Sequence, residues 1–241
     1  MNLISTFKER SPWLPNDAVT WRHGAVKYFY QIELGRMLQN EPASSRDLEV
    51  PYLKAQHVQW GNVRLKELPT MWAAPKDIEI LRVHEGDLLV CEGGEVGRSA
   101  IVQSNPPENC IIQNALHLVR GKQGNNVRFL GYLLRHAADQ GWFDVLCNRA
   151  TIAHFTVDKF GEIYFALPGI DEQSAIAEYL DRETARIKRH GLLVEGSRGT
   201  CERAINCKKA HQILEICCQS LSAGMLKSTG RNRLGAEITC G

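Results

Sequence analysis

Residues 163–187, IYFALPGIDEQSAIAEYLDRETARI, decide how this chain is organised. Alternate side chains from Ile163 to Leu167 are large and apolar, which is the period-two pattern of a β-strand. Pro168 and the glycine after it end the strand, because proline has no N–H to donate and glycine turns freely. Asp171 is then expected to cap the first N–H groups of a helix. The stretch therefore predicts a strand joined to a helix by a short turn.

The predicted helix carries a narrow apolar stripe. Ile176, Leu180 and Ile187 lie on one side, and Glu183 occupies the heptad position between the last two. An isolated helix of this length is marginal in water, so the stripe needs a partner. The core of the same domain, a second helix of the chain, a second copy and another protein all remain open as that partner. We expect part of the stripe to stay available as a partner-docking surface.

The bulk composition is that of a globular protein with a buried core. The chain has 241 residues, of which 44% are hydrophobic and 23% charged, enough for one large domain or two small ones. No run approaches the roughly 20 apolar residues of a membrane span. Residues 1–15 lack the apolar core of a secretion signal, so we expect a cytoplasmic protein with no membrane partner. The formal charge of +2 neither requires nor excludes nucleic acid.

The eight cysteines have no secretory context that would oxidise them. Cys91 and Cys110 fall in apolar, strand-like runs, where a thiol behaves as a small hydrophobe. Four more lie near the C-terminus, with His211 among them: Cys201, Cys207, Cys217 and Cys218. Their spacing is not the paired C-x-x-C of a convincing zinc site, so we expect free thiols and no bound metal.

Residues 51–65, PYLKAQHVQWGNVRL, predict a strand that turns at Gly61-Asn62 into a second short strand over 63–65. The polar residues before it, 39–50, are expected to form a loop. The polar side of the hairpin carries Lys54, Gln56, His57, Gln59 and Asn62. By composition alone, a solvated face explains them best. The alternative is a row of amide side chains, which can pair in bidentate fashion with adenine.

Residues 81–102, LRVHEGDLLVCEGGEVGRSAIV, predict a second hairpin. Its strands cover 88–91 and 96–102, and Gly93-Gly94 between them tolerates the positive φ of a tight turn. The preceding residues, 69–80, contain two prolines and are expected to form a loop.

Four polar residues lie in or beside these strands. Asp87 is expected to cap a turn, and Glu92 and Glu95 are expected to be solvated. Arg98 has two interpretations of equal weight, a surface ion pair or a contact with a phosphate or a guanine edge.

Residues 105–108, Asn-Pro-Pro-Glu, come close to a catalytic motif. Adenine and cytosine N-methyltransferases carry Asn/Asp-Pro-Pro-aromatic, but Glu108 replaces the aromatic residue here. No glycine-rich cofactor loop after a strand precedes it, and no nucleophile–base pair stands out elsewhere. We predict a proline turn, no catalytic residue and no cofactor.

Residues 110–119, CIIQNALHLV, predict a buried strand that contains two adjacent amides, Gln113 and Asn114. Buried amides need partners, so they either satisfy a bulge or a neighbouring backbone, or emerge at a binding surface. Residues 127–139 predict an amphipathic helix with apolar side chains at spacings of three and four. Residues 27–32 fit either a strand or a short helix.

In their order, these motifs resemble the target-recognition domain of the DNA-specificity subunit of type I restriction–modification systems. The resemblance covers roughly residues 20–188. The motifs that carry it are the turn at Trp60-Gly61, Gly-Asp-Leu-Leu at 86–89 with Val-Gly-Arg at 96–98, the helix at 127–139, and Leu-Pro followed by Glu-Gln, Ile-Ala and Leu-Asp at 167–181. Two features depart from the family. Ala150-Thr151 stands where the family has a Gly-Thr type segment, and three glycines, Gly191, Gly196 and Gly199, weaken the long helix that the family continues with.

The resemblance implies an α+β fold, namely a mixed, mostly antiparallel β target-recognition domain with packed helices, followed by a C-terminal spacer helix. It places the recognition domain at residues 1–168 and a helical spacer or dimerisation segment at 169–221. Residues 222–241 are expected to be a disordered tail.

The resemblance also implies a function. Such a subunit reads one half of a bipartite DNA site and docks methyltransferase subunits, without chemistry of its own. Its partners would be double-stranded DNA, an adenine methyltransferase subunit, a restriction subunit with translocase and nuclease activity, and in one alternative a second copy of the chain. The expected DNA-binding residues are Lys54, Gln56, His57, Gln59, Asn62, Arg98, Gln113, Asn114, Arg149, Thr151 and His154.

Other interpretations compete with this one. The chain has room for one recognition domain where a complete subunit usually has two, so it is expected to be a half-size subunit that dimerises or a fragment. A truncated interaction module that no longer reads DNA is the second candidate. A methyltransferase or nuclease is the third, and it lacks a cofactor loop and an acidic-lysine constellation.

Overall fold

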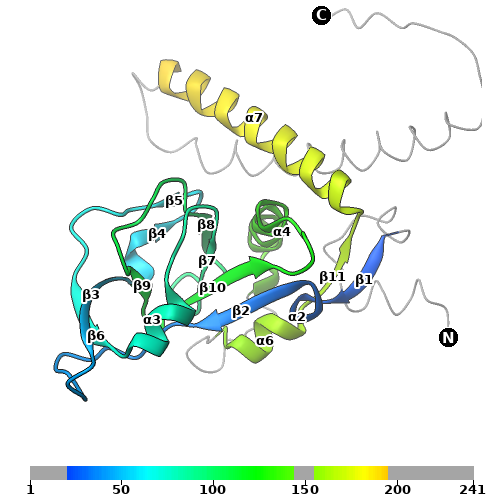
Figure 1. The fold of residues 1–241 in the computed structure, drawn as a ribbon. Helices are drawn as coiled ribbons and strands as arrows, with labels where there is room; N and C mark the ends of the chain where they lie inside the picture. Colours follow the sequence, from blue (N-terminus) through cyan, green and yellow to red (C-terminus); the bar gives the residue numbers. More distant parts are fainter. Residues whose placement is uncertain (1–20, 144–154, 195–241) are drawn as a thin grey trace, which may run out of the picture.

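The computed structural model describes residues 21–143 and 155–194, with side chains described as far as Arg186 (Figure 1). Its strands are β1 (Arg22–Ala25), β2 (Tyr30–Leu34), β3 (Leu48–Leu53), β4 (Val58–Gln59), β5 (Asn62–Val63), β6 (Thr70–Ala73), β7 (Leu88–Cys91), β8 (Ser99–Ile101), β9 (Ile111–Ile112), β10 (Leu116–Gly121) and β11 (Tyr164–Leu167). Its helices are α2 (Val26–Phe29), the 3₁₀ helix η2 (Ala55–His57), α3 (Pro75–Leu81), α4 (Val127–Asp139), α6 (Val157–Glu162) and α7 (Ile170–Val194).

The strands form sheets of mixed direction. Their orders are β2-β10-β7-β8, β6-β3-β9, β1-β11 and β4-β5. Every pair of named strands is antiparallel except β3 with β9, which run parallel. The predicted α+β class with a mixed, mostly antiparallel sheet is confirmed.

Strand β7 lies between two hydrophobic clusters. Leu88 and Val90 belong to a cluster with α4, α6, β11 and α7. Leu89 and Cys91 point to the opposite face and belong to a cluster with β3, α3 and β9. Because both faces are buried, the strand is apolar at every position. The predicted hairpin is confirmed, with Leu88 opposite Ile101.

The expected single strand over 110–119 is wrong. The chain leaves the three-stranded sheet at β9 and enters the four-stranded sheet at β10. At the crossing, the Gln113 N–H donates to Leu53 O and the Asn114 N–H donates to Arg36 O. Gly35 lies so close that a Cβ there would fall 2.2 Å from Gln113 O. Two amides therefore sit where the backbone bonds change sheets.

Two segments expected to be loops contain regular structure. Residues 39–50 end in β3, and residues 69–80 form β6 and most of α3. Strand β3 tolerates Pro51, and Pro75 occupies the first helical turn of α3, where a missing N–H is harmless. The predicted first hairpin also differs, because its first strand ends at Leu53 and the 3₁₀ helix precedes a two-residue pairing of β4 with β5.

The predicted helix at 127–139 is confirmed as α4. Asn126 caps it by accepting from the N–H groups of Arg128 and Phe129. Residues 27–32 contain both expected alternatives, because α2 runs directly into β2.

The strand–turn–helix element is confirmed as β11 followed by α7. Strand β11 pairs with β1, so the first described strand lies beside the strand that leads into α7 (Figure 1). The helix begins at Ile170, so Asp171 lies in the first turn and does not occupy the cap position that the sequence suggested. An acidic residue there still favours the helix through its dipole.

Candidate nucleic-acid interface

The short hairpin β4–β5 and the 3₁₀ helix before it present three exposed amides. Gln56, Gln59 and Asn62 are all exposed to solvent. The Gln59 amide nitrogen donates to Gln56 O over 3.1 Å. Arg64, which the sequence did not single out, donates from Nη2 to the same carbonyl over 3.0 Å. The structure thus gathers three of the predicted residues on one edge and adds an exposed cation.

His57 does not belong to that edge. Its side chain is buried, and its Nδ1 accepts the Lys54 N–H at 3.1 Å. Burial, followed by the charges of Lys54 and Arg64, lowers the pKa of the imidazole. Because the ring is buried and closes the 3₁₀ turn, it does not lie on the exposed edge, which corrects the sequence-based placement of His57. Lys54 itself is half-buried.

Arg98 is likewise held inside the domain. Its Nη2 donates to Ala55 O over 3.0 Å, and its Nη1 lies 3.2 Å from Glu95 Oε2. The side chain is only 15% exposed, and Nε has no partner among the described residues. The guanidinium links the turn after β7 to the 3₁₀ helix. The structure therefore supports an ion pair of Arg98, formed with Glu95, over a contact with a phosphate or a guanine edge.

Glu95, expected to be solvated, connects three elements. Its Oε1 accepts the indole N–H of Trp60 at 2.5 Å, and its Oε2 accepts from Arg98. The Trp60 ring in turn lies under the Arg135 guanidinium of α4, 4.7 Å from the ring centroid. Trp60 between the strands of the hairpin, Glu95 in the glycine turn and Arg135 on the helix form what we call the Trp60 bracket. In the sequence, only the Trp60-Gly61 motif pointed to a role for one member of this bracket.

Gln113 and Asn114 are half-buried. The Gln113 N–H donates to the carbonyl of Leu53, the last residue of β3. Gln113 therefore lies beside the end of the strand that leads to Lys54. The three remaining predicted DNA-binding residues, Arg149, Thr151 and His154, lie outside the described residues. The described residues that flank them are close together, since the rings of Phe143 and Phe155 are 5.1 Å apart. The Phe155 N–H donates to Glu92 O.

The proposed docking stripe is mostly internal. Ile176 is 5% and Leu180 is 1% exposed, and both belong to the core cluster that contains α4. These two residues are therefore not a free docking surface, which settles their partner as the core of the same domain. The side chain of Ile187 lies outside the described residues.

Other expectations concern metals, thiols and membranes. In the part of the chain that the structure describes, no group of three His, Cys, Asp or Glu side chains is placed to hold a metal. Cys91 and Cys110 are free and buried, and burial raises the pKa of both thiols, that of Cys110 to about 12. The cluster near His211 lies outside that part. No described helix is long and apolar enough to span a membrane.

Comparison with known structures supports a shared fold. A structure described as the basis of complex assembly and conformational transition of the type I R-M system has 18% identity and a TM-score of 0.54, over 85% of this chain and 46% of that one. The HsdS subunit from Thermoanaerobacter tengcongensis has 18% identity and a TM-score of 0.50, over 89% of this chain and 49% of that one. This chain thus spans about half the length of each.

No curated protein matches the chain. Residues 20–193 match the family described as "Type I restriction modification DNA specificity domain". That family is a specificity domain and not a catalytic one, in agreement with the expectation that the chain performs no chemistry itself. The chain belongs to the type I restriction–modification DNA-specificity family.

Proposed function

We propose that this protein is a DNA-specificity subunit that reads one half of a bipartite site for a type I restriction–modification complex. The observation that carries the proposal is the exposed edge of Gln56, Gln59 and Asn62. It lies on a hairpin that the hydrogen bond between Trp60 and Glu95 holds to the rest of the domain. Glutamine and asparagine pair in bidentate fashion with the N6 and N7 atoms of adenine in the major groove. Arg64 beside them supplies a cation for a backbone phosphate.

The bracing supports a reading function because base contacts need fixed donors and acceptors. A flexible hairpin would have to lose its conformational entropy on binding DNA, which weakens the complex. Arg98 and the Trp60 bracket hold both ends of the hairpin to the body before DNA arrives. His57 fixes the turn that presents Gln56. We place these supporting residues behind the DNA-contacting edge.

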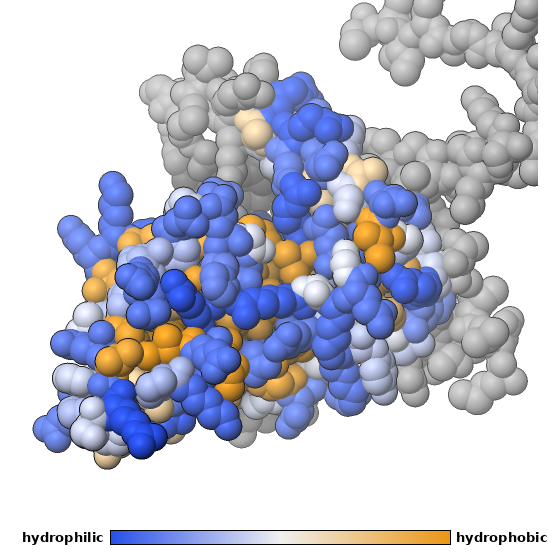
Figure 2. All heavy atoms as spheres, viewed as in Figure 1, coloured by the Kyte–Doolittle hydropathy of each residue, from blue (hydrophilic) through white to orange (hydrophobic). Residues whose placement is uncertain are grey.

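The proposed partners are an adenine methyltransferase subunit and, through the complete complex, a restriction subunit. We further propose the cytoplasm as the site of action, because the substrate is cellular DNA. Since Ile176 and Leu180 are internal, docking would use the outer side of α7 and the segment that follows it. Figure 2 shows mainly hydrophilic residues on the face of α7 in view, so the contact would be more polar than the sequence suggested.

A selection experiment tests the function. The full chain is combined with an adenine methyltransferase subunit of a type I system and exposed to random double-stranded DNA. We expect enrichment of a short adenine-containing sequence, and we expect Gln59→Ala to abolish the enrichment while the complex still assembles. A wild-type complex that assembles but enriches no sequence would refute the proposal and favour an interaction module.

A further inference from the structure

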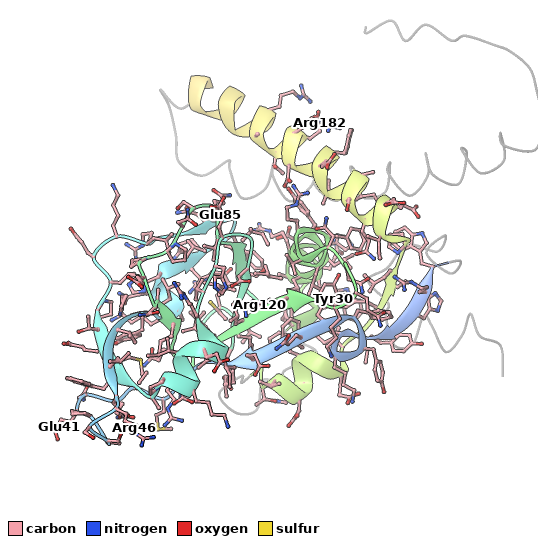
Figure 3. The ribbon with its side chains drawn as sticks, in the orientation of Figure 1. Tyr30, Glu41, Arg46, Glu85, Arg120 and Arg182 are labelled. Atoms are coloured by element: carbon pink, nitrogen blue, oxygen red, sulfur yellow. The ribbon has the colours of Figure 1, made fainter. Side chains whose placement is uncertain are left out.

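His117 is a fully buried imidazole in β10, the strand that also carries Arg120 in Figure 3. Its Nε2 lies 2.6 Å from Phe155 O. Because a carbonyl oxygen only accepts, Nε2 carries the hydrogen of this bond and donates it. Burial lowers the pKa of the imidazole, so the ring is neutral and Nδ1 carries no hydrogen. Nδ1 has no hydrogen-bond partner among the described residues.

The surroundings of this ring are apolar. Its cross-strand neighbours are Leu34 of β2 and Val90 of β7. The rings of Phe155 and Phe160 lie 6.3 and 5.8 Å from the imidazole, between centroids. A buried polar atom without a partner costs free energy, so an apolar side chain would fill this place at lower cost. What the imidazole supplies, and an apolar side chain could not, is the hydrogen bond to Phe155.

Phe155 connects the core to the glycine turn, which comprises residues 92–98 between β7 and β8. The Phe155 N–H donates to Glu92 O over 2.9 Å. The Phe155 ring packs 5.1 Å from that of Phe143, between centroids. Phe143 in turn covers Gly97, where a Cβ would fall 2.4 Å from the ring. Phe155 therefore holds one end of the turn by a backbone bond and the other end through Phe143.

The same turn holds the hairpin β4–β5 and the 3₁₀ helix before it. Glu95 accepts the indole N–H of Trp60, and Arg98 donates to Ala55 O. Both bonds start from residues of the glycine turn, so the position of the hairpin follows the position of the turn. The turn thus contacts the core on one side, through Phe155, and the hairpin on the other.

We infer that His117 is a positioning residue for DNA reading: through Phe155 it fixes the glycine turn, and the turn fixes the hairpin that carries the exposed amides. The inference rests on the proposed function, since it names a support of the DNA-contacting edge. His117 itself is buried and does not touch DNA. Its bond to Phe155 weakens steeply with angle, whereas the stacked rings are held by non-directional apolar contacts, so the bond sets the position.

The first experiment compares two substitutions of His117 that differ in one donor. In His117→Gln, the amide nitrogen lies as far from the backbone as Nε2 and still donates to Phe155 O. In His117→Met, the side chain has the same length and packs well against aromatic rings, but it has no donor. Hydrogen exchange is followed by NMR in the full-length protein without DNA.

Two amides report on the turn and the hairpin. They are the Gly97 N–H, which donates to Cys91 O, and the Arg64 N–H, which donates to His57 O. We expect both to exchange roughly tenfold faster in His117→Met, the size expected when a buried hydrogen bond is lost. His117→Gln should restore the wild-type exchange. Unchanged exchange in a folded His117→Met protein would overturn the inference.

The control is Tyr30→Phe on β2 of the same sheet, at a position that Figure 3 labels. It removes a buried hydroxyl that donates to Asn126 O over 3.2 Å, away from the glycine turn. We expect wild-type exchange at Gly97 and Arg64 in this variant. Equal acceleration in Tyr30→Phe and His117→Met would reveal a general loss of stability and would likewise overturn the inference.

A measurement on the wild type applies if His117→Met does not fold. Amides that open in one cooperative unit show the same protection against exchange. We expect the Nε2 proton of His117 to be protected to the same degree as the amides of Phe155 and Gly97. A His117 proton that exchanges much faster than these amides would show that its bond is not part of the support.

The second experiment measures DNA reading in the methyltransferase complex. We expect His117→Met to lower the ratio of specific to non-specific affinity roughly tenfold, with non-specific affinity unchanged, because base contacts carry the sequence information. His117→Gln should restore the ratio. An unchanged ratio in His117→Met would overturn the inference. A wild type that selects no sequence would instead refute the proposed function, and the exchange measurements would then judge whether His117 positions the hairpin.

Discussion

The indole N–H of Trp60 lies 2.5 Å from Oε1 of Glu95, and this bond joins the turn of the hairpin β4–β5 to the glycine turn between β7 and β8. The two residues are 35 positions apart in the chain. The Glu95 carboxylate also forms an ion pair with Arg98, so a single carboxylate orders both turns. Because the proposed DNA-contacting amides sit on the same hairpin, we treat this bond as the support of the interface.

Trp60→Phe keeps a ring under Arg135 and removes only the indole N–H. We expect a modest loss of about 1 kcal/mol in the free energy of unfolding, because Glu95 is half-exposed and water replaces part of the bond. Hydrogen exchange over residues 58–63 should accelerate, and discrimination between DNA sequences should fall. Trp72→Phe, a half-buried tryptophan in β6, is the matched control and should change neither. Unaltered exchange in Trp60→Phe would show that the bond does not order the hairpin.

Gln59→Ala and Arg64→Ala should weaken DNA binding in different ways. Loss of a bidentate contact to adenine reduces specific binding by roughly 1–3 kcal/mol and leaves non-specific binding unchanged. Loss of a phosphate contact weakens binding to all sequences and lowers the slope of affinity against salt concentration by about one ion. Titrations at several salt concentrations separate the two effects. Gln31→Ala, an exposed amide on β2, serves as the control. If Gln59→Ala and Gln31→Ala behave alike, the DNA contacts lie elsewhere.

Two of the buried histidines, His57 and His117, should make stability depend on pH. Burial is the largest cause of the lowered pKa of both His57 and His117. Their folded-state pKa values lie below the unfolded value of about 6.5, so the unfolded chain binds more protons between these limits. The contribution of these two histidines to the free energy of unfolding should therefore be fully present above pH 7. It should be lost as the pH drops through 6.5. Urea titrations at a series of pH values measure this slope.

His57→Asn tests the share of one histidine in that slope. Asparagine retains an oxygen near the Lys54 N–H but does not titrate. The variant should show a shallower loss of stability below pH 6.5 than the wild type, and it should bind DNA with unchanged sequence preference at pH 7.5. A specific loss of base discrimination at pH 7.5, with the fold intact, would return His57 to the DNA-contacting edge.

Leu180→Asp should unfold or strongly destabilise the recognition body. Leu180 is 1% exposed, and removing a buried leucine side chain alone reduces stability by about 2–5 kcal/mol. An uncompensated buried carboxylate adds to that loss. Tyr179→Asp, at the neighbouring position with 36% exposure, should leave the melting temperature within a few degrees of the wild type. A Leu180→Asp protein that melts like the wild type would return Leu180 to a docking surface.

Local patterns were enough to predict several elements. The period-two alternation before Pro168 predicted β11, and the apolar stripe of residues 127–139 predicted α4. The glycine turn after Cys91 predicted the β7–β8 hairpin. These elements are specified by neighbours in the sequence, and the family resemblance followed from their order. Membership of the specificity family confirms that order as informative.

The sequence misplaced residues whose environment is set by distant segments. His57 directly follows Gln56 in a polar pair, which suggested an exposed residue, yet the 3₁₀ turn buries it. Residues 110–119 were predicted as one strand because apolar residues lie on both sides of Gln113 and Asn114, although the backbone bonds change sheets at Gln113. Which groups a backbone bonds to is not encoded by the local pattern of hydrophobicity.

The sequence by itself determined individual elements, including the strand–turn–helix element at residues 163–187, and the family resemblance that its motifs carry implied the α+β fold. Only the tertiary structure decided that Glu95 is a support, that Arg98 is internal, that Leu180 is core and that His117 bonds to Phe155. The physical reason is that a periodic pattern defines which face of an element is apolar, whereas the role of a polar side chain depends on the donors and acceptors brought to it from elsewhere in the chain.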